Sequence, residues 1–337
     1  MGEWAIRVKD LRKEYPGRNG PVHAVQGVDL EIKHGECFGL LGPNGAGKTT
    51  TVEILEGLNS PTSGEVEVLG REWRTDEVAI RERIGVTLQE TRFPDKETVH
   101  EIVSLFRSFY KTGMNPDDVI ARVSLESKSN AFIEQLSGGQ QQRLAVAIAL
   151  VGDPEVLFLD EPTTGLDPQS RRQLWEVIRD LRDRGRTVVL TTHYMDEAER
   201  LCDRVAIIDQ GKIIAQGSPA ELIARLGGDH IVEFALEIAG DAEVQEAVSF
   251  RGLDSVLAAR VENDGYSLTV AEPHRAIPAL LDELDRQQRP LIRLTTRHVS
   301  LEDVFVSLTG RHLRDDETSE AAAAAKPSGR KNRRRRG

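Results

Sequence analysis

The sequence is poor in several features that mark whole classes of protein. It has only two cysteines, Cys37 and Cys202, and neither has the spaced Cys or His partners of a zinc site. Its longest strictly apolar run, Leu144–Val151, is less than half of the roughly 20 residues that cross a bilayer, and the first residues form no signal-peptide core. We therefore expect a cytoplasmic chain with no membrane span and two reduced, buried thiols.

Basic residues are also outnumbered, with 44 Lys and Arg against 55 Asp and Glu and a net charge of -11. This balance argues against a protein held on nucleic acid by bulk basicity. Seven basic side chains lie within residues 326–337, which leaves 37 basic against 55 acidic residues elsewhere. We expect residues 311–337 to form a disordered basic tail, either solvated or in weak contact with anionic lipid. Unchanged vesicle binding after deletion of residues 326–337 would exclude the lipid contact.

Periodic clusters of apolar residues predict a sizeable core and, at 337 residues, about two domains. Residues 1–227 alternate short apolar runs with helical patterns, which indicates an α/β domain. The runs Cys37–Leu41, Val156–Asp160 and Thr187–Thr191 lack polar alternation. Such runs are typical of parallel strands that are covered on both faces.

Residues 228–310 change to a period-two pattern and predict a small α+β domain. Val232, Phe234, Leu236 and Ile238 fall on one strand face, and a turn at Asp264-Gly265 predicts a hairpin. The further elements that we expect here are strands over Ser255–Glu262, Tyr266–Val270 and Leu291–Thr295 and helical stripes over Ile277–Leu284 and Leu301–Leu308.

A glycine-rich phosphate-binding loop follows the first buried strand and precedes a helical stretch. It consists of Gly42, Pro43, Asn44, Gly45, Ala46, Gly47, Lys48 and Thr49. Glycines let the backbone N–H groups surround phosphates, Lys48 adds a positive charge, and the Thr49 hydroxyl can hold Mg²⁺. Thr50 is a weaker candidate for a further phosphate contact.

Two adjacent carboxylates, Asp160 and Glu161, end the strand Val156–Asp160. Ligands of doubly wound sheets bind beyond the carboxyl ends of strands, so these groups belong beside the phosphate loop. We assign Asp160 to Mg²⁺ through water and Glu161 to the role of general base. A solvated acidic pair at a strand end is the alternative.

A third motif consists of Leu136, Ser137, Gly138, Gly139 and Gln140 at the start of a helical run. Ser137 and Gln140 fit a helix capping box, which is the purely structural interpretation. Capping does not require the two glycines, however. Gly138 and Gly139 would let a second phosphate-bearing ligand approach the helix N-terminus, with Ser137 donating a hydrogen bond.

Together the phosphate loop, the acidic pair and LSGGQ resemble the ATP-binding subunits of ABC transporters over residues 4 to about 225. Gln89 matches the Q-loop, Asp167 the D-loop, His193 the switch histidine and Tyr15 the aromatic residue that stacks on adenine. The resemblance implies an α/β P-loop NTPase with a RecA-like core and a helical signature subdomain over residues 90–147.

The resemblance also implies roles for these residues, with ATP and Mg²⁺ as ligands. His193 would contact the γ-phosphate and hold Glu161 and water in place, Lys48 would complete the catalytic set, and Gln89 would sense Mg²⁺ and nucleotide. Taken alone, His193 fits a histidine at the edge of the core and Tyr15 fits simple packing. The order of the motifs favours the ATP-site roles.

The resemblance implies that two such subunits, expected to be a homodimer, hold ATP between the phosphate loop of one and the signature of the other. Whether the two subunits are identical stays open. The helical subdomain would receive a coupling helix of a separate membrane permease. Residues 228–310, with Ser300–Phe305 near their end, resemble the extension of daunorubicin-resistance-type exporters of drugs, antibiotics or lipids; a carbohydrate-binding extension would be a longer β-sandwich.

We therefore expect a peripheral ATPase on the cytoplasmic face of the membrane. The alternatives are a soluble ABC ATPase of DNA repair, chromosome structure or translation, the ATPase of an importer, and a non-enzymatic regulator. No coiled-coil insertion, zinc-type cysteine set or second cassette accompanies the motifs, and the acidic charge disfavours duplex DNA. The substrate stays open because the permease would hold it.

Overall fold

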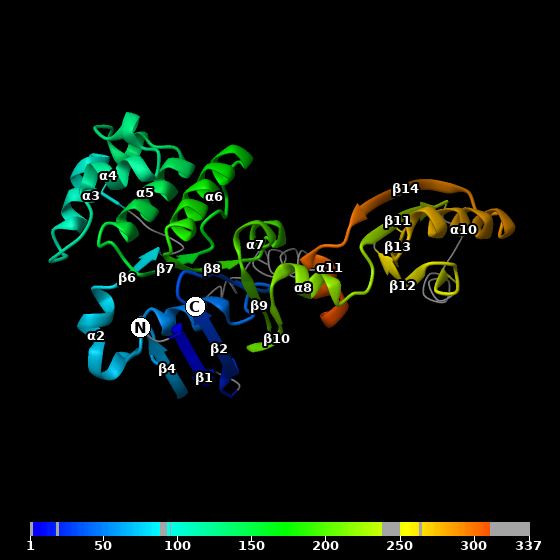
Figure 1. Cartoon of the computed structure of the whole chain (residues 1–337), viewed down its shortest axis with the longest axis horizontal. Coiled ribbons are helices and arrows are strands. Elements are labelled where there is room, and N and C mark those ends of the chain that lie inside the picture. Colours follow the sequence, from blue (N-terminus) through cyan, green and yellow to red (C-terminus); the bar gives the residue numbers. More distant parts are fainter. Residues whose placement is uncertain are drawn as a thin grey trace, which may run out of the picture.

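The computed structural model contains three sheets with their surrounding helices (Figure 1). The structure describes residues 3–17, 20–87, 93–94, 96–237, 250–262 and 265–310. Gln89, Ile238, Asp264 and the tail over residues 311–337 lie outside the described residues. Among the residues that are described, no helix is long and apolar enough to cross a membrane.

The central sheet has six strands in the order β10-β9-β3-β8-β7-β6. All neighbours pair in parallel except β10, which is antiparallel to β9. The strands are β3 Cys37–Leu41, β6 Ile84–Thr87, β7 Val156–Asp160, β8 Thr187–Thr192, β9 Arg204–Asp209 and β10 Lys212–Gly217. The predicted buried parallel strands are thus confirmed, with β8 one residue longer than expected.

Both faces of this sheet are covered, as the absence of polar alternation predicts. Phe38 and Leu40 of β3 and Phe158 of β7 enter one apolar cluster, whereas Leu157 and Leu159 of β7 enter another on the opposite face. Because neither face meets water, polar groups on these strands are favoured only at the strand ends.

The first of these clusters lies between the central sheet and a four-stranded antiparallel sheet of order β2-β1-β4-β5. Its strands are β1 Trp4–Tyr15, β2 Val22–Lys33, β4 Ser63–Val68 and β5 Arg71–Glu72. Helix α1, Lys48–Leu55, contacts both sheets, and α2, Trp73–Arg81, follows β5. Packing α1 between two sheets fixes the helix that directly follows the phosphate loop.

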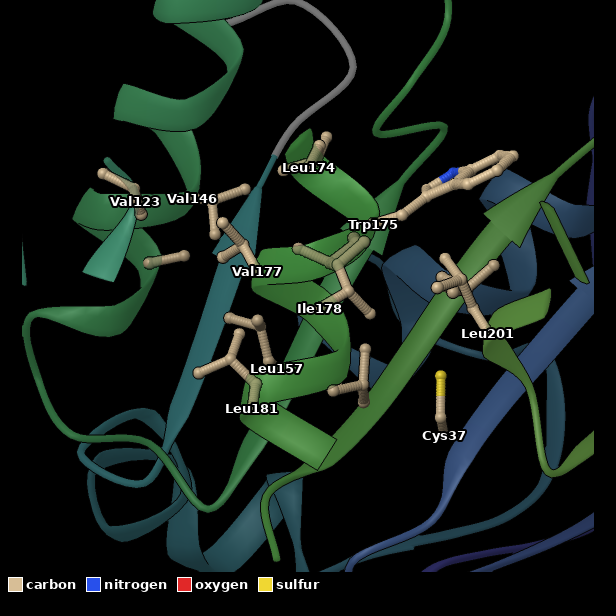
Figure 2. Packing of buried hydrophobic residues seen from close by; sticks show 14 of the residues in the cluster. Cys37, Val123, Val146, Leu157, Leu174, Trp175, Val177, Ile178, Leu181 and Leu201 are labelled. Carbon is tan, nitrogen blue, oxygen red and sulfur yellow. The ribbon is translucent and has the colours of Figure 1, made fainter. Parts of the chain in front are cut away.

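The second cluster lies under a layer of helices on the other face, seen in Figure 1 above the central strands. These elements are α3 Val99–Arg107, α4 Pro116–Arg122, the short 3₁₀ turns Glu126–Lys128 and Ile133–Gln135, α5 Gly138–Leu150, α6 Pro168–Asp183 and α7 Met195–Leu201. Figure 2 shows Val177 and Leu181 of α6 near Val146 of α5 and Leu157 of β7. Helices α3, α4 and α5 contact one another and form the helical part of this domain.

A separate antiparallel sheet of order β12-β13-β11-β14 follows α8, Pro219–Ala224. Helix α10 covers one face, where Phe234, Phe250 and Tyr266 form an aromatic cluster. The next row across the strands is polar, with Glu233 paired to Thr295 and to Ser267. The elements are β11 His230–Leu236, β12 Val256–Glu262, β13 Gly265–Val270, α10 Pro273–Arg286 and β14 Leu291–His298.

The last helix, α11 over Leu301–Thr309, leaves this sheet and packs on the first domain. Leu301, Val304 and Phe305 belong to the cluster under the helical layer, and the Leu301 N–H donates to Glu199 Oε1 at 2.7 Å. Figure 1 shows α11 beside α8. The apolar stripe of α11 therefore completes the core of the first domain, while the residues before it form the C-terminal sheet.

Candidate active site

The phosphate loop joins β3 to α1 with a backbone that only glycine allows at two points. At Gly42 a Cβ atom would collide with the carbonyl oxygen of Ile208 on β9. Gly47 has a φ of 102°, and a Cβ there would collide with the Ala24 carbonyl. Close packing against two neighbouring segments thus selects these glycines.

Lys48 lies at the centre of this loop and is only 4% exposed. Its ammonium group donates hydrogen bonds to the carbonyl oxygens of Gly42 at 2.8 Å and Pro43 at 3.1 Å. Asn44 and Gly45 are exposed on the loop, Ala46 is buried, and the N–H of Ala46 donates to the Pro43 carbonyl. The charge of Lys48 is thereby held where the loop can surround an anion.

Three threonines follow Lys48 in the first turns of α1. Thr49 is exposed and Thr50 is half-buried at the start of the helix. Thr51 is buried instead, and its hydroxyl donates to the Gly47 carbonyl at 2.8 Å. The described contacts thus leave Thr49 and Thr50, and not Thr51, as candidates for a ligand.

Asp160 and Glu161 emerge at the carboxyl end of β7, and Thr191 of β8 connects them. The Thr191 hydroxyl donates to Asp160 Oδ1 and accepts from the Glu161 backbone N–H at 2.9 Å. Asp160 is 7% exposed, and this burial raises the pKa of its carboxyl group. A cation beside Asp160 would offset that cost because it favours the ionised form.

Glu161 contacts the side chains of Lys48, His193 and Thr164. Its φ of 46° is a left-handed conformation that a non-glycine residue rarely adopts. One carboxylate oxygen lies 3.7 Å from Lys48 Nζ, and the other lies 3.4 Å from His193 Nδ1. The Thr164 hydroxyl donates to Glu161 at 3.1 Å. Residues from β3–α1, β7 and β8 thus meet at one point.

These neighbours set the ionisation of Glu161. The contact with His193, the Lys48 charge and the Thr164 hydroxyl together lower the pKa of Glu161 despite its burial. Glu161 is therefore ionised at neutral pH, as a proton acceptor must be. Burial, by contrast, raises the pKa of Asp160.

The signature motif begins α5, and the capping box proposed as its structural alternative is formed. Ser137 Oγ accepts from the Gln140 N–H at 3.3 Å, and Gln140 Oε1 accepts from the Ser137 N–H at 2.9 Å. Gly139 contacts α6, because a Cβ there would collide with Ser170. A Cβ at Gly138 would meet open space. Of the two glycines, Gly139 therefore has a packing explanation, and Gly138 borders space open to a ligand.

Leu136, which precedes Ser137, anchors the motif through the core. It is 7% exposed and belongs to the apolar cluster under the helical layer. The signature therefore presents Ser137 and Gly138 outward from a fixed base.

Asp167 and Tyr15 each have a defined structural partner. Asp167 caps α6, since its carboxylate accepts from the N–H groups of Gln169 and Ser170. Tyr15 ends β1, and its phenolic oxygen accepts from Asn59 Nδ2 at 2.6 Å. The Lys13 ammonium lies 4.9 Å from the centre of the Tyr15 ring. Both residues are held in fixed orientations.

Sequence reasoning missed Thr191, Thr164, Asn59 and Glu56. Thr191 lies two residues before His193 on a buried strand, where a polar residue could have drawn attention. Glu56, at the end of α1, is 3% exposed; burial and then the charges of Asp160 and Glu53 raise its pKa to about 8. Its sequence context is an ordinary helical surface pattern, so no sequence signal identifies it.

The fold and this cluster define a P-loop nucleotide-binding protein. A family model described as "ABC transporter" matches residues 25–164. The Nod factor export ATP-binding protein I of Ralstonia nicotianae is 40% identical over 92% of this chain and 95% of its own length. The protein of the same name from Paraburkholderia xenovorans is 40% identical over 94% of this chain and 100% of its own length.

A solved structure is similar as well. It is a dimeric ATP-binding cassette in a post-hydrolysis state, bound to ADP and Pi, with 30% identity and a TM-score of 0.58. The likeness covers 63% of this chain and 98% of that chain. This chain therefore belongs to the ATP-binding proteins of ABC transporters, and it is an ATPase with the expected P-loop fold.

Proposed function

We propose that Lys48, Glu161 and His193 form the catalytic centre for ATP hydrolysis. The observation that supports this is their convergence, with Glu161 3.7 Å from Lys48 and 3.4 Å from His193 at the ends of neighbouring strands. Glu161 orients the attacking water and accepts its proton, and His193 holds the Glu161 carboxylate. Lys48 stabilises charge on the phosphates, so catalysis consists mostly of positioning and electrostatics.

The remaining residues of the site bind the nucleotide. The loop from Gly42 to Thr49 surrounds the phosphates, with Thr50 as a further contact. Tyr15 stacks on adenine through the ring face not taken by Lys13, and its hydrogen bond to Asn59 fixes the ring. Gln89, outside the described residues, keeps its proposed role near the metal and the nucleotide.

A Mg²⁺ ion fits the donor set of this site. Thr49 offers a hydroxyl and Asp160 a carboxylate, the oxygen ligands that Mg²⁺ prefers in combination with waters and phosphates. Burial raises the pKa of Asp160, and a cation bound beside its carboxylate would favour the ionised form. Bound there, Mg²⁺ supplies positive charge to the phosphates, with Thr49 as direct ligand and Asp160 acting through water.

A second copy of this chain would complete each site. Leu136, Ser137, Gly138, Gly139 and Gln140 act in trans in this proposal, because α5 and its capped end belong to the helical part of the domain. The open space beside Gly138 is where the partner's nucleotide would approach. Asp167 would lie at the same interface. Loss of the γ-phosphate then removes the bridge between Lys48 of one copy and Ser137 of the other.

We further propose that this ATPase energises export through a separate membrane permease, as a peripheral subunit on the cytoplasmic face. The supporting observation is the match to export ATP-binding proteins over more than nine-tenths of the chain, including the C-terminal sheet. The transported molecule is expected to be a drug, antibiotic or lipid-like compound, and no nucleic-acid partner is expected.

A Glu161→Gln variant tests both parts of the proposal. It keeps the shape of the side chain, so it should bind ATP but hydrolyse it at least about a hundredfold more slowly. It should also accumulate as an ATP-bound dimer in size-exclusion chromatography. A variant that stays monomeric with ATP would refute the dimer model.

Tagged Glu161→Gln protein, extracted with mild detergent and ATP from its native host, tests the partner. A co-purifying polytopic membrane protein supports the transporter proposal. Recovery of ribosomes or DNA alone would favour a non-transport ATPase. Ser137→Arg is the matched control, since it should bind ATP yet neither hydrolyse it nor dimerise.

A further inference from the structure

A pocket of about 370 Å³ lies between α6 and α7, outside the candidate active site. Trp175 is the aromatic residue that the described part of the chain contributes to its lining, and Figure 2 shows this side chain on a different side of α6 from Val177 and Leu181. Its lining residues are Pro168, Arg171, Arg172, Trp175, Glu176, Arg179, Asp196 and Arg200. The volume falls within the range of small-molecule sites.

The four arginines of this α6–α7 pocket have no carboxylate partner among the described residues within 4.0 Å. Neighbouring arginines on the same helix and just after it, Arg182 and Arg184, do pair with carboxylates. Glu176 and Asp196 lie in the same lining without pairing to them. Four guanidinium groups against two carboxylates leave the pocket with a net charge of +2.

Uncharged partners nevertheless hold each arginine in place. The Arg171 guanidinium lies over the Tyr194 ring at 4.4 Å, and Arg200 lies over the Trp175 ring at 5.5 Å. The Nε of Arg172 donates to the Pro168 carbonyl at 3.2 Å, and that of Arg179 donates to the Trp175 carbonyl at 3.4 Å. Such contacts orient a guanidinium without a direct ion pair, although Glu197 acts on Arg171 and Glu199 on Arg200 from a longer distance.

One hydrogen-bond donor of Arg171 is buried without an acceptor among the described residues. This donor is the Nε of its guanidinium group. An unpaired buried donor is costly, and an anion in the pocket would reduce that cost. Arginine clusters of fixed geometry favour phosphate groups, which accept several hydrogen bonds at once.

We infer that the α6–α7 pocket binds a small organic phosphate that carries two negative charges. The charge of the ligand matches the net +2 of the lining, and the volume leaves room for an organic portion over Trp175. The ligand would lie between the helix capped by Asp167 and the helix that starts two residues after His193. This binding site is additional to the ATP site and does not depend on its proposed roles.

The indole N–H of Trp175 reports on the pocket, since it donates to the buried Glu197 beneath it. We would titrate glycerol 3-phosphate into the full chain with its ATP site filled by Mg·ADP, at constant ionic strength. The expected result is a saturable shift of the Trp175 indole resonance with half-saturation at or below about 1 mM. Glycerol should cause none.

Substitutions then localise the effect. Arg171→Gln/Arg172→Gln should weaken binding at least about tenfold, because two of the four charges are lost. Arg184→Gln is the matched control, as Arg184 ends the same helix but pairs with Asp180 outside the pocket, and it should bind normally. Absence of a shift in the unmodified chain up to about 20 mM, or equal binding by the double variant, would overturn the inference.

Discussion

The central sheet and the C-terminal sheet solve burial in opposite ways. Both faces of the central sheet are apolar, so its polar residues gather at the carboxyl ends of β7 and β8. The C-terminal sheet packs an aromatic cluster against α10 on one face, whereas its other face carries polar residues along the strands, some of them buried. The comparison teaches that two apolar faces concentrate functional polar groups at one edge of a sheet, whereas a sheet with one polar face distributes its polar groups along the strands.

The two regions also differ in how their buried charged groups are paired. At the C-terminal sheet, Arg297 pairs with Asp303 and Glu233, both at 2.7 Å, and these carboxylates raise the pKa of Arg297. At the candidate active site, burial raises the pKa of Asp160 against the opposing effect of Lys48, and burial with the charges of Asp160 and Glu53 raises the pKa of Glu56 to about 8. A network of paired charges stabilises the folded chain, whereas a buried carboxyl group without a cationic partner favours its protonated form.

Phe305→Ala gives the largest expected effect and tests where the first domain ends. Phe305 is fully buried in the core under the helical layer, so the loss should cost about 4 kcal/mol of the stability of that domain. Calorimetry with and without Mg·ATP identifies the unfolding transition whose temperature rises when nucleotide binds. Phe305→Ala should lower the temperature of that transition.

Phe250→Ala is the control for that experiment. Phe250 is equally buried but belongs to the C-terminal sheet. Its loss should leave the nucleotide-sensitive transition unchanged. If the two variants behave alike, the two cores unfold as one unit and the comparison fails.

Lys48→Ala is expected to weaken ATP binding at least a hundredfold, about 3 kcal/mol, because a buried charge at the phosphates is lost. Isothermal titration calorimetry measures this affinity directly. Lys212→Ala, at an exposed position of β10, should bind ATP normally. An affinity within threefold of the unmodified chain would contradict the assigned role of Lys48.

Glu56→Gln tests whether the buried Glu56 makes the stability of the folded chain depend on pH. The raised pKa of Glu56 means that the folded chain holds a proton that the unfolded chain releases above its ordinary value of 4.5, so stability falls as pH rises toward 8. The pKa shift of Glu56 sets an upper bound of about 5 kcal/mol on the stability that is lost at high pH. We expect a loss of about 2 kcal/mol, because the site relaxes when Glu56 ionises.

Denaturant unfolding at pH 5 and pH 9 checks this prediction. The variant should match the unmodified chain at pH 5 and exceed it at pH 9, whereas Glu72→Gln, at an exposed position, should match it at both. Equal stability of Glu56→Gln and the unmodified chain at pH 9 would show that Glu56 is not held protonated.

Ile292→Ser should have the smallest effect. Ile292 on the edge strand β14 is 66% exposed, so its replacement should change stability by less than about 0.5 kcal/mol. Thermal unfolding of the two proteins in parallel is sufficient. A clearly larger loss would mean that another surface covers this strand in solution.

Sequence reasoning found the parts of the molecule whose physics is local. The phosphate loop, strand β7 and the capping box of Ser137 depend on neighbouring residues, and each is where the pattern predicts it. Thr191, Asn59 and Ser170 instead act on residues that are distant in the sequence. Thr191 contacts Glu161, Asn59 contacts Tyr15, and Ser170 limits the space at Gly139. The periodicity of apolar residues predicts which side chains are buried, but not which element they pack against. The apolar stripe of α11 therefore did not indicate that this helix packs on the first domain.

The return of α11 makes the C-terminal sheet an insertion rather than an appendage. The chain enters and leaves it at adjacent points, since the Val299 N–H donates to the Asp229 carbonyl at 3.2 Å. A module with its two ends side by side can be exchanged, shortened or removed while the host keeps its own last helix. Related ATPases could therefore acquire different modules at this junction without rebuilding the nucleotide site.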